Sequence, residues 1–269
     1  MVYKVSMSLS ARLKRPLYDL YLRKLRLEMR SWRIPRHIGI VLDGNRRYAR
    51  GLGALSVLKG HERGANKLDE VLTWCQRAGV HAVSVWVFSL DNFNRDPEEV
   101  NGLMSLFERK FLDLVTNPRV HSDQIRVRSF GRLELLPEAV RDAIREAERA
   151  TEHYTHRMLN VGIAYGGREE ILDAFSRYLE DGEARGRSFA DLRRELSAET
   201  LAQHLYTSHV PDPDLIIRTS GEVRLSGFML WQSAYSEFYF CDTYWPAFRE
   251  IDFLRALRAY HSRQRRYGR

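Results

Sequence analysis

The chain has 269 residues, 44% of them hydrophobic, which is enough to bury the core of one large domain. No stretch approaches the roughly 20 consecutive apolar residues of a membrane-spanning helix and no signal-peptide pattern opens the chain, so we expect a cytoplasmic protein. The net charge is +8, but residues 1–36 contain ten Lys and Arg against two acidic residues, so the rest of the chain is neutral, which disfavours a nucleic-acid-binding body.

The first predicted segment is a basic arm, residues 1–34. Leu17, Leu20, Tyr21 and Leu25 follow approximately helical spacing among basic residues. Two interpretations stay open for this arm. It is either a helix that lies on the body with a solvated basic face, or a helix that contacts an anionic membrane surface and makes the protein peripheral to the membrane.

The remaining residues, 35–269, are predicted to form one domain. Segments with helical periodicity separate most of its apolar runs, notably residues 64–78, which end at Gly79, and a helix that opens at Pro97. Alternating strands and helices predict an α/β fold: a central, mostly parallel sheet of about six strands flanked by helices. The strand candidates are residues 37–42, 82–88, 125–130, 159–164, 215–217 and 237–240.

The first of these strands runs directly into Asp43-Gly44-Asn45-Arg46-Arg47. Gly44 permits a tight turn, and the two guanidinium groups suit phosphate oxygens. Asp43 would repel a phosphate, so its presence beside two arginines indicates a bridging Mg²⁺. The alternative is an ordinary turn in which Asp43 caps a helix and the arginines are solvated.

The fifth strand has the same design. It delivers Arg218, and Arg224 and Ser226 follow within eight residues, together with hydroxyl groups and a glycine. These arginines are suited to a second diphosphate, and Glu237 offers a second carboxylate for the metal. Two anion sites in one domain indicate two phosphorylated substrates.

These two segments closely resemble the cis-prenyltransferase family, also called the undecaprenyl diphosphate synthase or Z-isoprenyl diphosphate synthase family. The resemblance extends from about Pro35 to Gly268. It is supported by further segments in the family's order: Gly60-His61, residues 88–95, residues 160–168 and residues 245–248.

The resemblance implies a Mg²⁺-dependent transferase that condenses isopentenyl diphosphate with an allylic diphosphate, works as a homodimer, and has a hydrophobic tunnel between sheet and helices. Asp43 and Asn92 are the implied catalytic residues, with Ser89 nearby. The allylic diphosphate would bind Gly44, Asn45, Arg46, Arg47, His61 and Arg95. Isopentenyl diphosphate would bind Arg218, Arg224 and Ser226. The metal would bind Asp43 and Glu237, the latter from the same or the neighbouring subunit. The prenyl chain would be lined by Val87, Phe88, Leu103 and Phe107.

The expected product is short. Long-chain members of the family have a small residue at the position of Val87, so a branched side chain there would narrow the tunnel. The chain most resembles the branch that makes (2Z,6E)-farnesyl diphosphate from geranyl diphosphate. A decaprenyl or undecaprenyl product is the alternative chain length. The chain also has Leu90-Asp91 where many members have Ser-Glu, and this difference leaves a branched, lavandulyl-type coupling open.

An alternative from another class is a non-catalytic subunit of a two-component prenyltransferase. Such partners lack the strand-end aspartate and keep a C-terminal Arg-x-Gly. This chain has both Asp43 and Arg266-Tyr267-Gly268, which favours a self-sufficient homodimer.

Overall fold

A computed structural model describes residues 9–53 and 56–263, with side chains from Pro16 onward. Its core is a six-stranded sheet in the order β3-β4-β2-β1-β5-β6, and every neighbouring pair is parallel. The expected α/β fold and its six strands are confirmed. The strands are β1 (His37–Val41), β2 (Ala82–Trp86), β3 (Ile125–Phe130), β4 (Arg157–Gly162), β5 (Leu215–Arg218) and β6 (Glu237–Phe240).

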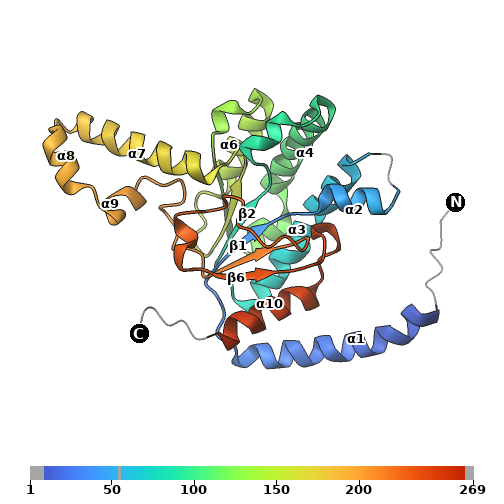
Figure 1. The fold of residues 1–269 in the computed structure, drawn as a ribbon. Coiled ribbons are helices and arrows are strands. Elements are labelled where there is room, and N and C mark those ends of the chain that lie inside the picture. The colour runs from blue at the N-terminus through green and yellow to red at the C-terminus, as the bar shows by residue number, and fades with distance from the viewer. Residues whose placement is uncertain (1–8, 54–55, 264–269) are drawn as a thin grey trace.

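Helices cover the sheet, as Figure 1 shows, while α7, α8 and α9 project from the body as an arm. Within this projection the Tyr178 hydroxyl donates a hydrogen bond to the Leu192 carbonyl and ties α7 to α8. The helices are α1 (Leu9–Glu28), α2 (Asn45–Gly51), α3 (Leu58–Ala78), α4 (Pro97–Thr116), α5 (Pro118–Ser122), α6 (Glu138–Thr151), α7 (Gly167–Ala184), α8 (Phe189–Glu195), α9 (Ala198–Ala202) and α10 (Glu250–Ser262).

The order of the strands decides where a ligand can bind. The chain passes from β1 to β2 on one side and later adds β5 on the other side of β1. In parallel sheets, ligands bind in the crevice beyond the carboxyl ends of the strands, at the point where the strand order reverses. Here that point lies between β1 and β5, the two strands that carry the predicted diphosphate motifs.

Two helices beside this crevice begin and end where the sequence requires. Helix α3 ends at Gly79, which adopts a positive φ of 82°. Helix α4 begins after Asp96, whose side chain accepts the backbone N–H groups of Glu98 and Glu99, and Pro97 occupies its first turn. Gly79 and Pro97 therefore mark these two helix boundaries, as the sequence predicted.

The N-terminal helix α1 packs against α10. Leu25 is fully buried, and the Arg26 guanidinium donates two hydrogen bonds of 2.8 and 2.6 Å to the Glu250 carboxylate. The rings of Tyr18 and Tyr21 lie 5.8 and 5.6 Å from the guanidinium groups of Arg249, the residue before α10, and Arg255 of α10. Within the described residues, no helix combines the length and the apolar character needed to cross a bilayer.

His37 belongs to a buried polar network at the first residue of β1. Its Nδ1 lies 2.6 Å from the Pro211 carbonyl and its Nε2 lies 2.8 Å from Ser84 Oγ, which also accepts a hydrogen bond from Asn160. Burial lowers the pKa of His37 to about 4. The imidazole is therefore neutral at pH 7, donating from Nδ1 and accepting at Nε2.

This network predicts a loss of stability in mild acid. The folded state holds His37 neutral, with a lower pKa than in the unfolded chain, so protonation favours unfolding. The contribution of His37 to the free energy of unfolding is therefore complete above the unfolded pKa of about 6.5 and is lost as pH falls toward 4. His37 should account for about 2 kcal/mol of the unfolding free energy lost between pH 7 and pH 5. Denaturant titrations of the wild type and His37→Gln at both pH values test this, and equal pH dependence of the two proteins would contradict it.

Candidate active site

The turn after β1 places Asp43 in the crevice. Gly44 has a φ of 104°, and a Cβ there would lie 2.8 Å from the Tyr244 ring, so both the conformation and the space require glycine. Helix α2 then begins at Asn45. The tight turn expected at Gly44 is confirmed, whereas Asp43 does not cap the helix, since its N-cap is Gly44 and no side chain caps it.

Asp43 is held by two arginines. Its Oδ2 accepts a 2.9 Å hydrogen bond from Arg218, and its Oδ1 accepts a 3.4 Å contact from Arg47. Burial raises the pKa of Asp43, but hydrogen bonds from Arg218 and Ser220 and the charges of both arginines outweigh this effect, so the pKa lies below its usual value. The carboxylate is ionised at neutral pH.

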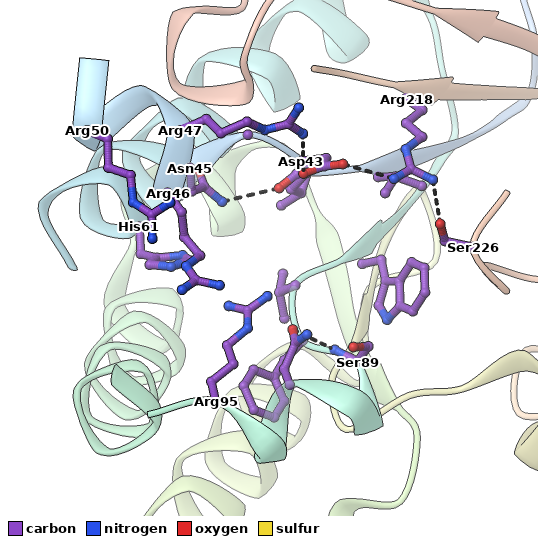
Figure 2. Close-up of a pocket in the computed structure, with 17 residues that line it drawn as sticks. Asp43, Asn45, Arg46, Arg47, Arg50, His61, Ser89, Arg95, Arg218 and Ser226 are labelled. Carbon is purple, nitrogen blue, oxygen red and sulfur yellow. Dashed lines mark hydrogen bonds and ion pairs between the residues drawn. The ribbon is translucent and has the colours of Figure 1, made fainter. Parts of the chain in front are cut away.

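Arg218, at the end of β5, joins the two predicted motifs. Its side chain is 5% exposed; besides Asp43 it donates a 2.7 Å hydrogen bond to Ser226 Oγ and another to the Arg224 carbonyl. Figure 2 shows Asp43 between Arg47 and Arg218, with Ser226 beyond. Segments 175 residues apart in sequence thus meet at one spot.

A second carboxylate, Glu222, organises the arginines on this side. It accepts a 3.0 Å hydrogen bond from Arg47 and also pairs with Arg224. Arg47 donates a further 2.8 Å bond to Ser220, and Arg224 Nε lies 3.2 Å from Ser226. The sequence analysis did not select Glu222, although it lies between the two arginines of the second motif.

On the opposite wall of the crevice, two arginines and a histidine surround the Glu99 carboxylate. This carboxylate is 5% exposed and accepts Arg95 at 3.0 Å and His61 at 3.3 Å, and Arg46 lies 3.5 Å away. Burial lowers the pKa of His61, the charge of Arg95 lowers it further and Glu99 raises it, leaving it below its usual value. A neutral His61 satisfies the contact by donating Nε2–H.

Glu99 was also missed by the sequence analysis. The available signal was its position four residues after Arg95 in the first turn of α4, which allows a side-chain pair. An acidic residue in a first turn normally has an exposed, dipole-stabilising role. Here the side chain turns inward because three basic groups converge on it.

We expect Glu99→Gln to raise the KM for the anionic ligand of this wall by about 10- to 100-fold, since charge-assisted hydrogen bonds contribute about 1.5–3 kcal/mol each. The substitution should also lower the pKa of His61, because Glu99 raises it. Steady-state kinetics and an NMR titration of His61 measure both effects. Glu98→Gln, one residue away and exposed, is the control, and equal behaviour of the two variants would contradict the role.

The two walls enclose a polar cavity of about 360 Å³. Of the predicted residues, Asp43, Gly44, Asn45, Arg46, Arg47, His61, Val87, Phe88, Asn92, Arg95, Arg218 and Ser226 line it. Asn92 accepts the Ser89 N–H through its side-chain oxygen at 3.1 Å. Lining residues that sequence analysis did not select include Arg50 and Trp86.

An apolar cavity of about 90 Å³ adjoins the polar one. Leu42 and Val87 line both cavities, so they lie at the boundary between them. The other walls come from α3, α4 and β4, and include Phe107 and Phe111. Of the four predicted tunnel residues, Val87 and Phe107 line this cavity, whereas Phe88 faces the polar cavity and Leu103 lies one turn earlier on α4, buried in the core.

Comparison with known proteins agrees with this geometry. Residues 41–268 match the family model described as "Putative undecaprenyl diphosphate synthase". An isoprenyl transferase of Thermus thermophilus is 57% identical over 258 residues, 96% of this chain and 97% of the relative. The chain belongs to the undecaprenyl diphosphate synthase, or cis-prenyltransferase, family. It is a prenyltransferase.

Two other members of the family differ in their named activity. A protein of Methanopyrus kandleri named tritrans,polycis-undecaprenyl-diphosphate synthase (geranylgeranyl-diphosphate specific) is 50% identical, covering 95% of this chain and 92% of the relative. The crystal structure of lavandulyl diphosphate synthase from Lavandula x intermedia, in complex with dimethylallyl diphosphate, superposes with a TM-score of 0.79 at 35% identity, covering 88% of this chain and 99% of that one.

For this cis-prenyltransferase, the expectation that Glu237 reaches Asp43 within one chain is wrong. Glu237 is the first residue of β6 and pairs in register with Leu215, the first residue of β5, whereas Asp43 follows the other end of β1. Parallel strands therefore place the two carboxylates at opposite edges of the sheet. Glu237 instead accepts a 2.7 Å hydrogen bond from Arg263. A contribution from a neighbouring subunit stays a prediction, and Arg266-Tyr267-Gly268 lies outside the described residues.

The donor set of the polar cavity fits a magnesium ion that is shared with a substrate. Asp43 is an ionised, partly exposed carboxylate that lines the cavity. No cluster of three or more His, Cys, Asp or Glu side chains in the described part of the chain suits a metal held by protein alone. Mg²⁺ commonly binds through one or two carboxylates plus substrate phosphates, which matches this arrangement.

Proposed function

We propose that this cis-prenyltransferase binds an allylic prenyl diphosphate and isopentenyl diphosphate in the polar cavity and joins them with release of diphosphate. The observation that supports this most is the hydrogen bond between Asp43 and Arg218, which brings both anion-binding motifs to one cavity. The adjoining apolar cavity supplies a place for a hydrocarbon chain.

The allylic diphosphate would occupy the wall formed by Gly44, Asn45, Arg46 and Arg47, with His61 and Arg95 opposite. Val87 lies at the boundary with the apolar cavity, so the hydrocarbon tail of this substrate can enter that cavity while its diphosphate stays among the arginines. Arg46 and Arg95 are already oriented by Glu99, which lowers the cost of arranging them around an anion.

Isopentenyl diphosphate would bind Arg218, Arg224 and Ser226. The Ser226 hydroxyl is within hydrogen-bond distance of both guanidinium groups, so all three polar groups converge on one point. Arg224 is exposed and is not part of the cavity lining, so it would have to turn inward from Glu222 when the substrate arrives.

Asp43 would hold Mg²⁺ together with diphosphate oxygens. When bound, the ion supplies positive charge that stabilises the departing diphosphate. Arg46, Arg47 and Arg95 stabilise the same developing charge in a site preorganised by ion pairs. The apolar walls beyond Val87 exclude water from the allylic carbon as its bond to diphosphate breaks.

The new carbon–carbon bond forms between the allylic carbon and the terminal alkene carbon of isopentenyl diphosphate, which then loses a proton. Asn92 is an amide and cannot act as a strong base, and its oxygen is already engaged by the Ser89 N–H. We therefore assign to Asn92 and Ser89 the orientation of the isopentenyl group. The proton passes to an oxygen of the diphosphate.

For the product, we propose a long Z-polyprenyl diphosphate. Relatives with 45–50% identity over nearly the whole chain carry undecaprenyl diphosphate synthase names. The short product, (2Z,6E)-farnesyl diphosphate from geranyl diphosphate, is the second candidate, because Val87 stands at this boundary and the apolar cavity beyond it is only about 90 Å³.

Product sizing separates these candidates. Purified protein is incubated with Mg²⁺, labelled isopentenyl diphosphate and geranyl, farnesyl or geranylgeranyl diphosphate, and the dephosphorylated alcohols are sized. A ladder to C50 or C55 supports the long product and a single C15 alcohol supports the short one. Dimethylallyl diphosphate supplied alone should give no product; a branched C10 product would instead show lavandulyl-type coupling.

Val87→Ala should lengthen the product distribution by at least one isoprene unit, because it removes bulk at the boundary that both cavities share. The same sizing assay measures the shift. Val223→Ala, at a position that is 74% exposed and outside both cavities, is the control. An unchanged distribution would show that Val87 does not limit the tunnel.

The homodimer is part of this proposal. Among the described strands, β6 is an edge strand that pairs with β5 alone, and Leu172 and Phe175 are exposed apolar residues that a partner could cover. Light scattering of the purified protein tests the dimer. Prenyltransferase activity of the purified chain alone would exclude the interpretation that it is a non-catalytic subunit of a two-component enzyme.

A further inference from the structure

The outer face of α1 is the most unusual surface left unexplained by the active site. One side of this helix packs on α10 through Tyr18, Tyr21, Leu25 and Arg26. Figure 1 shows the helix running along the outside of the molecule beside α10. Its opposite side therefore faces away from the body.

That opposite side carries three leucines. Leu17, Leu20 and Leu27 are 69, 66 and 62% exposed. Their spacing of three and seven residues puts them along one stripe of an α-helix, on the side away from Leu25. Single exposed leucines are common on protein surfaces, but an aligned stripe on a helix whose other face is already packed indicates a second contact.

Basic side chains surround this stripe. Arg23 and Lys24 on α1 and Arg30 just after its end are exposed. The acidic residues of the helix are Asp19, which is exposed, and Glu28, which pairs with Lys24 at 3.7 Å. Residues 1–36 carry the whole net charge of the chain, +8, so the positive charge is concentrated in this segment. An apolar stripe with flanking Lys and Arg is the arrangement of helices that lie in the interface of anionic membranes.

We propose that the outer face of α1 binds the surface of an anionic lipid bilayer, with Leu17, Leu20 and Leu27 inserted among the acyl chains and Arg23, Lys24 and Arg30 at the lipid headgroups. A second copy of the chain is the poorer occupant. A two-fold interface would place this basic face opposite itself, where like charges repel. This inference does not depend on the reaction, because from Pro16 onward, where its side chains are described, α1 contributes no residue to either cavity of the active site.

The test is co-sedimentation of the full chain with sucrose-loaded vesicles, either of pure phosphatidylcholine or of an equal mixture of phosphatidylcholine and phosphatidylglycerol. The wild type should pellet with the mixed vesicles and much less with the neutral ones, and added salt should weaken binding. The triple variant Leu17→Ser, Leu20→Ser, Leu27→Ser should lower the partition coefficient at least about tenfold.

Two further variants complete the design. Arg23→Gln, Lys24→Gln, Arg30→Gln should lose the preference for anionic vesicles, whereas Leu112→Ser, Leu135→Ser, which removes exposed leucines from other elements, should bind as the wild type does. All variants should keep the wild-type circular dichroism spectrum because the changed residues are exposed. The proposal is overturned if the wild type stays in the supernatant with both vesicle types, or if the leucine variant pellets like the wild type. It is also overturned if that variant loses self-association rather than lipid binding, which would make a second copy the occupant.

Discussion

Asp43→Asn should lower kcat by about a thousandfold, the largest effect expected for any single substitution in this chain. Asn is nearly the same size and can still accept the hydrogen bond from Arg218, so the fold should remain. The loss is that of a negative charge, which the site needs to hold Mg²⁺ beside the diphosphate. Without it, Arg47 and Arg218 also face each other without the carboxylate between them.

The measurement is steady-state incorporation of labelled isopentenyl diphosphate at saturating magnesium. Asp242→Asn is the matched control, because Asp242 is exposed and lies outside both cavities. Its activity should be that of the wild type. If Asp43→Asn retained more than about a tenth of wild-type kcat, the carboxylate would not be part of the catalytic site.

Arg218→Lys should raise the KM for isopentenyl diphosphate by about a hundredfold while the KM for the allylic substrate changes little. Arg218 contacts Asp43 through one guanidinium nitrogen and Ser226 through another. A lysine ammonium keeps the charge but cannot reproduce this planar fork. Each lost charge-assisted hydrogen bond contributes about 1.5–3 kcal/mol, so the substitution is not conservative.

This effect is measured by varying each substrate in turn. Arg193→Lys, an exposed change on α8 with the same chemistry, should leave both KM values unaltered. A change confined to the allylic KM would mean that the two diphosphate sites have been assigned in the wrong order.

The strands and the strand-end residues were the most predictable parts of the molecule. Buried parallel strands require near-continuous apolar runs, so β1 and β5 are visible as runs of Ile, Val and Leu, and Asp43 and Arg218 follow directly from where those runs stop. Gly44 was predictable for a similar reason, since a tight turn with positive φ selects glycine.

Other features depend on the three-dimensional arrangement. Glu99 looks like an ordinary acidic residue of a helical first turn until Arg46, His61 and Arg95 are seen around it. Glu237 was placed in the site by motif, and the direction of β6 excludes this within one chain. The tunnel was implied by the family resemblance, and helical periodicity does not tell a cavity-lining residue such as Phe107 from a core residue such as Leu103.

We propose that the ends of β1 and β5 hold two diphosphates against one another. A crystal structure with Mg²⁺, isopentenyl diphosphate and an unreactive thiolo analogue of the allylic diphosphate tests it most directly. We expect one diphosphate on Gly44–Arg47 and the other on Arg218 and Ser226, with the metal on Asp43 and the hydrocarbon tail passing Val87. Ligands bound on separate surfaces, or an Asp43 that contacts neither metal nor diphosphate, would contradict the account.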